Sequence, residues 1–220
     1  MFKNATADVS QLATEKRLLE AAGEIFAEYG YRAATVRQIC EKADANIAAV
    51  NYHFRDKEGL YLAVLRSVPD AHAEKYPPNS GLNPEADAEQ KLRAYIHSML
   101  RRVFDAGRPG WHAKILAREM VEPTRAFDRL VEEVARPVHN ELASIVRELL
   151  GTGTGNEAVR LCTLSIISQC VYYHHARPVI ERLYPEQKYG SDEIERLADH
   201  VTDFCLGALR RFSQKAGECR

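Results

Sequence analysis

Glycine and proline are gathered into four short clusters, and this spacing constrains the fold more than any other feature of the chain. The clusters are PPNSGLNP (77–84), GRPG (107–110), GTGTG (151–155) and YPEQKYG (184–190). The stretches between them, 85–106, 111–150 and 156–183, are 22 to 40 residues long, and their apolar residues recur at steps of three and four, not two. We therefore predict an all-α fold in which these clusters connect the helices.

The charges of the chain nearly cancel, with Lys+Arg 30 against Asp+Glu 31. This balance excludes a protein held to nucleic acid by bulk positive charge, so any DNA contact depends on where single cations stand. Hydrophobic residues make up 45% of the 220 residues, which is enough for a sizeable core. No run reaches the roughly 18 apolar residues of a membrane helix, and residues 1–10 lack the apolar block of a signal peptide. We expect a cytoplasmic protein without a membrane partner.

Catalytic and metal-binding signatures are missing from the sequence. Cysteines stand at positions 40, 162, 170, 205 and 219, with no CxxC pair and no zinc spacing. His174 and His175 are neighbours on a predicted helix, where their side chains diverge by about 100° and cannot easily share a metal ion. The motifs GxGxxG, GxSxG and HExxH and the P-loop are also missing. We predict no enzyme, no cofactor and no metal site.

The first predicted helix has one apolar stripe, with Thr14 as its cap and Gly30 as a left-handed stop. The stripe is formed by Leu18, Leu19, Ala22, Ile25, Phe26 and Tyr29. Four acidic residues also lie along this helix, and we expect them to face away from any DNA: Glu15, Glu20, Glu24 and Glu28.

Two brief helices follow, each with its own capping residue. Thr35 and Gln38 fit a capping box, which opens a helix that runs to about Lys42. After the short span 43–45, Asn46 can cap a second helix that runs to about His53. Two short helices joined by a three-residue turn predict a helix-turn-helix. Asp56 then caps a longer helix that starts at Lys57 and carries the chain into the rest of the fold.

The residue types of these helices suit DNA. The small or apolar side chains at 47–49 allow close approach to base edges, and Asn46 and Asn51 each offer the paired donor and acceptor that adenine needs. Thr35 and the free backbone amides beside it form an anion site, and Lys57 adds a cation for a second phosphate. The alternative is that the cap residues are only caps and that the Tyr52 ring packs against the following helix.

The stretch from Glu15 to about Arg66, with TVRQICEKADANIAAVNYHFRDKEGLYLAVL at its centre, resembles the DNA-binding domain of the TetR family of bacterial transcriptional regulators. The remainder, with REMVEPTRAFDRLVEE and SQCVYYHHARPVIERLYP, is similar to the CecR-like subgroup. The resemblance implies phosphate contacts for Thr35, Tyr52, His53 and Lys57, and contacts to bases or nearby backbone for Arg37, Gln38, Asn46, Ala48 and Asn51. Two departures are Asp44, where the family usually has Gly, and Asn51, where it often has Tyr.

The resemblance divides the chain into a DNA-binding domain at 1–66 and a larger helical domain for effector binding and dimerisation at 67–220. Helices predicted at 157–175 and 192–212 carry more apolar surface than one chain can cover, which favours a homodimer. Interface candidates are Ile166, Leu197, Val201, Phe204 and Ala208. The alternative, an intramolecular bundle, is reasonable for one of the two helices.

A small-molecule site is expected in the second domain, where aromatic and polar residues lie on helices that should enclose its middle. The candidate apolar wall is Phe104, Trp111, Met120 and Tyr173, and the candidate polar groups are Arg118, Gln169 and His174. Pro137 lies inside an otherwise helical run, so a kink there could widen the cavity. The alternative is a solid core without a cavity.

Together these features predict a ligand-responsive homodimeric repressor that binds a palindromic operator in double-stranded DNA and releases it when an unidentified small-molecule effector binds. The alternative function is an all-α small-molecule-binding protein with a vestigial helix-turn-helix. Its best support is that residues 1–66 contain equal numbers of basic and acidic residues.

Overall fold

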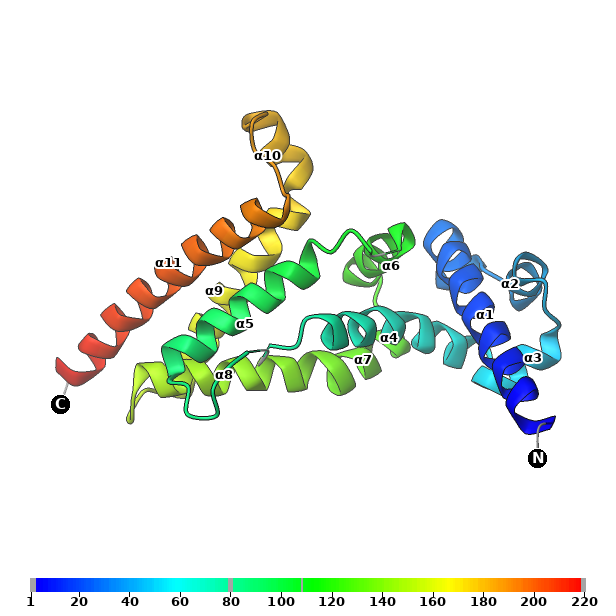
Figure 1. The fold of residues 1–220 in the computed structure, drawn as a ribbon, viewed down its shortest axis with the longest axis horizontal. Helices are drawn as coiled ribbons and strands as arrows, with labels where there is room; N and C mark the ends of the chain where they lie inside the picture. Colours follow the sequence, from blue (N-terminus) through cyan, green and yellow to red (C-terminus); the bar gives the residue numbers. More distant parts are fainter. Residues whose placement is uncertain (1–2, 79–80, 108, 219–220) are drawn as a thin grey trace. The chain divides into compact units, whose positions relative to one another are not determined.

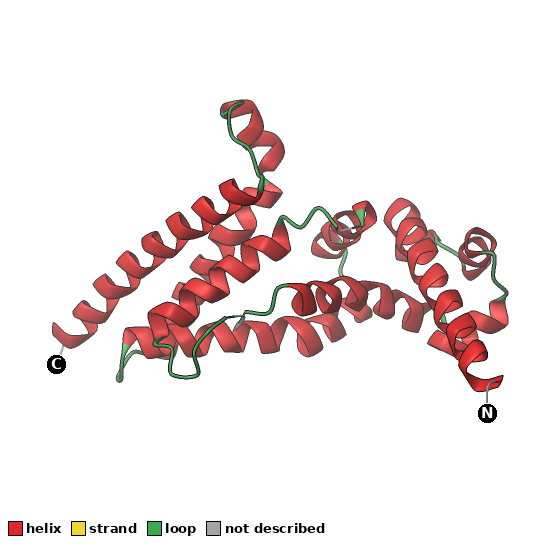
Figure 2. Cartoon of the chain, viewed as in Figure 1, coloured by secondary structure: helices red, strands yellow, loops and turns green. Residues whose placement is uncertain are grey.

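The computed structural model describes residues 3–78, 81–107 and 109–218, apart from the side chains of 3–10, 68–74 and 215–218. In this part of the chain every regular element is helical, which confirms the predicted fold class (Figure 2). Figure 1 labels the helices, which are α1 (Lys3–Ala33), α2 (Val36–Ala43), α3 (Ile47–Phe54), α4 (Lys57–Lys75), α5 (Ala88–Val103), α6 (Gly110–Val121), α7 (Arg125–Leu130), α8 (Arg136–Leu150), α9 (Asn156–His175), α10 (Arg177–Leu183) and α11 (Ser191–Glu218).

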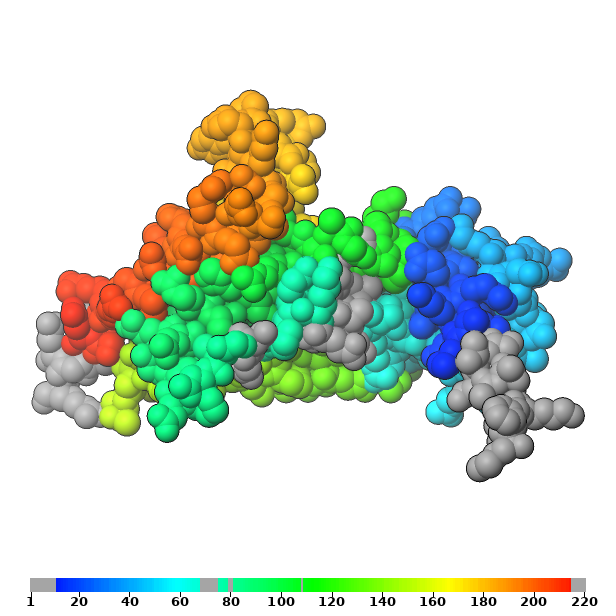
Figure 3. All heavy atoms as spheres, in the orientation of Figure 1, coloured from blue at the N-terminus to red at the C-terminus, as the bar shows by residue number. Residues whose placement is uncertain are grey.

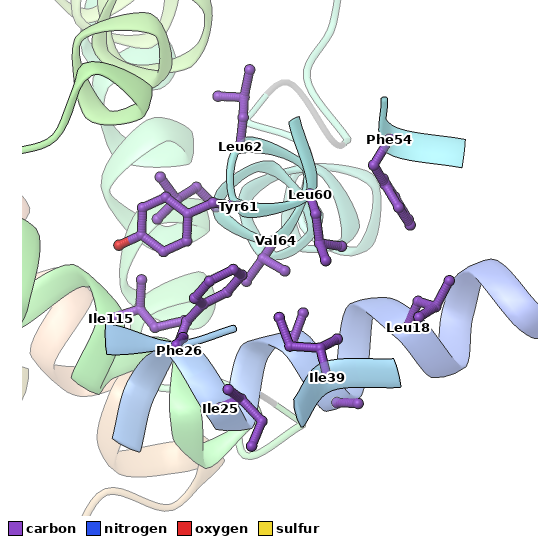
Figure 4. Packing of buried hydrophobic residues seen from close by; sticks show 14 of the residues in the cluster. Leu18, Ile25, Phe26, Ile39, Phe54, Leu60, Tyr61, Leu62, Val64 and Ile115 are labelled. Carbon is purple, nitrogen blue, oxygen red and sulfur yellow. The ribbon is translucent and has the colours of Figure 1, made fainter. Parts of the chain in front are cut away.

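The helices form two compact units. Unit 1 contains residues 1–71 and 107–135, and unit 2 contains residues 72–106 and 136–220. This division differs from a single boundary after residue 66, because α6 and α7 pack with the N-terminal helices. The cause is the apolar face of α6, where Trp111 and Ile115 are buried in the same core as α1. Figure 4 shows Ile115 close to Phe26 and Tyr61.

The core of unit 1 joins α1 to the helix-turn-helix and to α4. Its buried side chains include Leu18, Phe26, Ile39, Val50, Phe54, Leu60, Tyr61 and Ile115 (Figure 4). One buried carboxylate, that of Glu119, accepts hydrogen bonds from the Tyr61 hydroxyl at 2.5 Å and from the Thr124 amide at 2.8 Å and hydroxyl at 3.0 Å. Burial and the bond to Glu119 raise the pKa of Tyr61 well above its ordinary value. These bonds fasten α4 to the end of α6.

The first helix is longer than predicted. It begins at Lys3, so Thr14 lies inside it and the prediction that Thr14 caps its start is wrong. No Gly or Pro stands between Lys3 and Thr14 to stop the helix, so a good capping residue at Thr14 does not end it. Gly30 leaves the helical conformation, with φ 77° and ψ 165°, but this ψ is not that of the predicted left-handed stop, and α1 continues to Ala33 after the kink. A positive φ of this size favours glycine over residues that carry a Cβ.

The helical run that contains Pro137 changes its hydrogen-bonding pattern just before the proline. A π-helical turn, Val131–Ala135, separates α7 from α8. Proline has no backbone N–H to donate, so the regular bonding pattern of an α-helix cannot pass through Pro137. A π-turn two residues earlier is therefore a reasonable local solution.

Unit 2 packs α5, α8, α9 and α11 around one core, with Leu92, Tyr95, Leu142, Val146 and Ile166 among its buried side chains. Ion pairs cover the outside of the contact between α5 and α11, where Arg93 meets Asp199 and Asp203, and Arg101 meets Glu195. The short helix α10 packs against α9 and projects from the other helices of this unit (Figure 3).

The described residues contain neither a membrane-spanning helix nor a cluster of metal ligands. No described helix is long and apolar enough to span a bilayer, and no described His, Cys, Asp or Glu side chains gather in a group that could hold a metal ion. Four cysteines, Cys40, Cys162, Cys170 and Cys205, are free thiols buried in the cores. Cys219 lies outside the described residues.

Candidate functional site

The helix-turn-helix is held by side-chain caps at both short helices. The Thr35 hydroxyl accepts a hydrogen bond from the Gln38 amide at 3.2 Å, and the Gln38 side chain accepts one from the Thr35 amide at 2.9 Å. Both bonds of the predicted capping box are therefore present. At α3 the side-chain oxygen of Asn46 accepts from the Ala49 amide at 2.9 Å. The ends of both helices are fixed by local bonds that the sequence predicts.

The turn between α2 and α3 contains the left-handed residue that such a turn needs, although this residue is not a glycine. Asp44 adopts the left-handed conformation, with φ 48° and ψ 55°, which short polar side chains tolerate better than most. Arg17 of α1 braces the turn by donating to the backbone oxygens of Ala43 at 3.1 Å and Asp44 at 3.3 Å. The departure at Asp44 thus leaves the turn intact.

Helix α3, the second helix of the helix-turn-helix, presents one exposed side. Ile47, Ala48, Asn51 and Tyr52 are exposed, whereas Val50 and Phe54 are buried in the core. The Tyr52 side chain is 70% exposed, so it does not pack against α4 as the alternative required. The predicted contacts Thr35, Arg37, Gln38 and Asn46 are exposed as well. The side of α3 that could meet base edges is therefore free of intramolecular packing.

The two remaining DNA candidates, His53 and Lys57, are half-buried. The Lys57 ammonium donates to the backbone oxygen of Arg32 at 3.3 Å and lies 4.8 Å from the centre of the Tyr31 ring. Partial burial lowers the pKa of Lys57. An ammonium has three donor hydrogens, so this bond leaves capacity for a phosphate while it holds the start of α4 to the end of α1.

The acidic residues of α1 do not all face away from the helix-turn-helix. Glu24 pairs with Lys42 of α2 at 2.5 Å, and the carboxylate of Glu15 lies 3.7 Å from the His53 ring nitrogen. Both contacts arise because α1 packs directly on α2 and α3, and the orientation of these acids away from DNA stays a prediction. Glu20 faces α6, where it accepts from the Trp111 ring nitrogen at 3.0 Å.

The seven predicted ligand-binding residues are divided between the two units. Trp111, Arg118 and Met120 belong to unit 1. The Trp111 ring covers Gly23 in that core, and the Met120 side chain is 71% exposed. Arg118 donates to backbone oxygens at the end of α1. The residues of α6 were assigned to the second domain because sequence spacing cannot show which neighbour an amphipathic helix covers.

Phe104, Gln169, Tyr173 and His174 belong to unit 2. Gln169 and Tyr173 line an open groove of about 700 Å³ between α9 and α10. The other lining residues are Ser168, Tyr172, Ile180, Leu183, Tyr184 and Gln187. Near the end of α9, the ring centre of Phe104 lies 5.8 Å from that of His174 and 4.7 Å from that of Tyr189, on which it stacks. The contribution of α10 was not foreseen, although the apolar residues of RPVIERLY already mark it as a short amphipathic helix.

The predicted interface residues separate into buried and exposed ones. Ile166 and Val201 are buried by their own chain, at 2% and 1% exposure, so a partner could not contact them. Leu197 is half-buried, whereas Ala208 is exposed and Phe204 is 61% exposed. The sequence could not separate these roles because both sides of α9 and most of one side of α11 are apolar.

An exposed stripe also runs along α9. This α9 stripe consists of Leu161, Leu164, Ser165 and Ser168. The hydroxyls of Ser165 and Ser168 donate to backbone oxygens one turn earlier, at 2.8 and 2.7 Å. With those donors used inside the helix, the α9 stripe presents a small and largely apolar surface.

Comparisons with known proteins agree with this geometry. Residues 18–64 match the model of the bacterial regulatory proteins of the tetR family, and residues 88–209 match the C-terminal domain of the HTH-type transcriptional dual regulator CecR. CecR from Shigella flexneri is 29% identical over 210 residues, which cover 92% of this chain and 94% of CecR. The HTH-type transcriptional regulator BetI from Escherichia coli is 27% identical over 144 residues, covering 60% of this chain and 74% of BetI.

The fold also matches solved structures. FadR from Bacillus subtilis, a transcriptional regulator solved in complex with stearoyl-CoA, superposes with a TM-score of 0.61 at 20% identity, covering 87% of this chain and 97% of FadR. These relatives are transcriptional regulators and not enzymes. The chain belongs to the TetR family of DNA-binding transcriptional regulators, with a C-terminal domain of the CecR type.

Proposed function

We propose that this regulator is a homodimeric repressor that binds an inverted-repeat operator through α2 and α3 and releases it when a small, largely apolar molecule binds unit 2. The observation that carries the proposal is the exposed side of α3, together with the intact caps at the starts of α2 and α3. Asn51 and Tyr52 lie there without intramolecular packing, at positions from which side chains can reach bases and phosphates. This arrangement argues against a vestigial helix-turn-helix, in which caps and exposed readers have no reason to remain together.

The dimer is supported by the exposed apolar residues of α9 and α11. The α9 stripe and the exposed Phe204 and Ala208 belong to helices that pack on each other in one unit. Apolar surface that lies on neighbouring helices in this way is typical of an interface between identical subunits. A dimer would place two recognition helices in successive major grooves, so the operator should have half-sites about 34–36 Å apart, or a multiple of that.

DNA binding and dimerisation can be tested together. Duplexes selected from a random library by the wild-type chain should contain an inverted repeat, and a reporter promoter that carries it should be silenced. The double variant Phe204→Glu with Leu197→Glu should sediment as a monomer and lose operator binding. Arg196→Glu, a charge change outside these two positions on the same helix, should leave both unchanged. A wild-type chain that is monomeric at micromolar concentration would contradict the dimer.

The groove between α9 and α10 is the proposed effector site. Its size falls in the ordinary range of ligand sites, and its walls combine Tyr173, Ile180 and Leu183 with the amide of Gln169. Stearoyl-CoA is the first probe because its acyl chain is apolar and the structurally similar FadR was solved in complex with it. Saturating stearoyl-CoA should weaken operator binding about 5- to 150-fold, whereas CoA without the acyl chain should not. Leu183→Asp should remove the response but keep operator binding, and no release by stearoyl-CoA would contradict an acyl effector.

A further inference from the structure

Helix α1 is interrupted at Gly30, shortly before it ends at Ala33. Gly30 leaves the helical conformation, and α2 begins only a few residues later with Thr35 as its cap. The last backbone oxygens of a helix have no amide donor within the helix and need another partner. The connection from Gly30 to Thr35 sets how α2 and α3 are oriented against α1, so the way in which α1 ends matters for the whole helix-turn-helix.

Two backbone oxygens just before this interruption receive hydrogen bonds from a side chain of α6. The Arg118 guanidinium donates from Nε to the backbone oxygen of Ala27 at 3.1 Å and from Nη2 to that of Glu28 at 2.9 Å. Its remaining nitrogen lies 3.1 Å from the position that a Cβ on Gly30 would occupy. A planar cation with parallel donors suits two neighbouring backbone oxygens, and positive charge is favoured at the C-terminal end of a helix.

The packing of α6 on α1 places the exposed Arg118 beside these backbone oxygens. Trp111, Ile115 and Arg118 lie at steps of four and three, on one face of α6, and the first two are buried. Trp111 stands over Gly23 so closely that a Cβ there would meet the ring at 2.4 Å. The Trp111 ring nitrogen also bonds to Glu20. The absence of a side chain at Gly23 therefore lets the Trp111 ring pack against α1, and this contact positions α6 along α1.

We infer that Arg118 is a positioning residue for operator binding: by closing the end of α1, it fixes the connection that orients α2 and α3. Lys57 holds the same connection from α4 through its bond to Arg32. The functional DNA-binding module then includes α6, although it lies far away in the sequence. This inference rests on the proposed function, since it requires a specific operator.

The test compares Arg118→Met, Arg118→Lys and Lys114→Met in the full-length chain. Lys114 is an exposed cation of α6, so its replacement removes the same charge from the same helix without touching α1. Binding is measured on the duplex selected by the wild-type chain and on a scrambled duplex. Amide hydrogen exchange is measured at residues 31–38, where a loosened connection is visible directly.

Arg118→Met should weaken operator binding about tenfold and speed amide exchange at residues 31–38 by a similar factor, because two charge-assisted hydrogen bonds are lost. Binding to the scrambled duplex should change less than twofold, since non-specific binding does not need a fixed orientation of α3. Arg118→Lys keeps the charge without the planar fork and should fall between the wild type and Arg118→Met. Lys114→Met should match the wild type.

A second variant, Gly23→Ala, tests the same inference without changing any charge. Alanine favours a helix more than glycine does, yet its Cβ displaces the Trp111 ring and with it the register of Arg118. Trp111 emission should shift and operator binding should weaken.

Unchanged operator affinity in folded Arg118→Met or Arg118→Lys, or in Gly23→Ala with shifted Trp111 emission, would overturn the inference. A wild-type chain that selects no duplex would instead overturn the proposed function.

Discussion

The helix-turn-helix and the pair α9 and α11 are stabilised in opposite ways. Helices α2 and α3 are short, and polar caps at Thr35 and Asn46 define where they begin. Helices α9 and α11 are long and are held by apolar packing, with no side-chain cap bond at the start of α9. Short helices depend on local bonds because they bury little surface, whereas long amphipathic helices gain most of their stability from their core.

This difference decides what a change does in each region. A substitution in α2 or α3 should act mainly on DNA binding or on one cap. A substitution in α9 should act on stability if the side chain faces the core, and on assembly if it faces solvent. The following predictions test this distinction, in order of decreasing effect.

The largest effect should come from truncating a core residue of α9. Ile166→Ala should lower the free energy of unfolding by about 2–5 kcal/mol, because a buried side chain leaves a cavity. Leu164→Ala removes a side chain that is 46% exposed, so the free energy of unfolding should fall much less, by about 0.5 kcal/mol. Urea unfolding followed by far-UV circular dichroism measures both.

The same two variants also distinguish a core residue from an interface residue. Leu164→Ala should raise the dimer dissociation constant in sedimentation, since Leu164 belongs to the α9 stripe. Equal losses of unfolding free energy in both variants, with no change in dimerisation for Leu164→Ala, would show that the α9 stripe is not an interface.

The next effect should come from the exposed side of α3. Asn51→Ala should cost about 1–3 kcal/mol of operator binding and relax the preference at one base position, as expected for an amide that reads a base edge. Lys57→Ala should weaken binding to all sequences and lower the salt slope by about 1 per half-site, with a further loss on the operator because Lys57 also holds the connection at Arg32. Equal loss on specific and scrambled DNA for Asn51→Ala would show that Asn51 does not read a base.

The sequence predicts the helix-turn-helix well because its signals are local. The capping box of Thr35 and Gln38, the cap at Asn46 and the left-handed Asp44 involve residues within a few positions of one another. Each of these elements is present in the structure. The start of α1 was missed because Thr14 is a good cap residue inside a stretch that continues as a helix.

Long-range partners could not be predicted. The amphipathic pattern of α6 shows that Trp111 and Ile115 are buried, but it does not show that α1 covers them. The same limit applies to α9, where apolar residues on several sides left core and surface indistinguishable. Ile166 and Leu164 are chemically alike and only two positions apart, yet one is buried and the other is exposed.

A smaller effect is expected from the cap of α2. Thr35→Ala removes the hydroxyl that accepts from the Gln38 amide and should lower the free energy of unfolding of unit 1 by about 1 kcal/mol. Thr35→Ser keeps the hydroxyl and should restore most of this loss. Trp111 is the only tryptophan in the chain, and it is buried in unit 1, so its fluorescence reports the unfolding of this unit. No difference between the two variants would contradict a stabilising cap.

The smallest effect is a pH dependence confined to unit 2. Hydrogen bonds from Arg101 and then His97 hold the pKa of Glu195 below its ordinary value of 4.5. A carboxylate with a lowered pKa in the folded state stabilises the fold above its unfolded pKa, and this contribution is lost as the pH falls through the folded pKa. The caps of Thr35, Gln38 and Asn46 do not titrate, so acid should loosen α5 from α11 while these cap hydrogen bonds remain.

Glu195→Gln isolates this contribution. The variant should be less stable than the wild type at pH 7, and the difference should shrink as the pH falls through the lowered pKa of Glu195, where the wild-type carboxylate becomes protonated. Because the Glu195 side chain is 37% exposed, the difference should stay below about 1 kcal/mol. Urea unfolding at several pH values, followed by circular dichroism for the whole chain and by Trp111 fluorescence for unit 1, measures it. A pH-independent difference would mean that Glu195 contributes through packing and not through its charge.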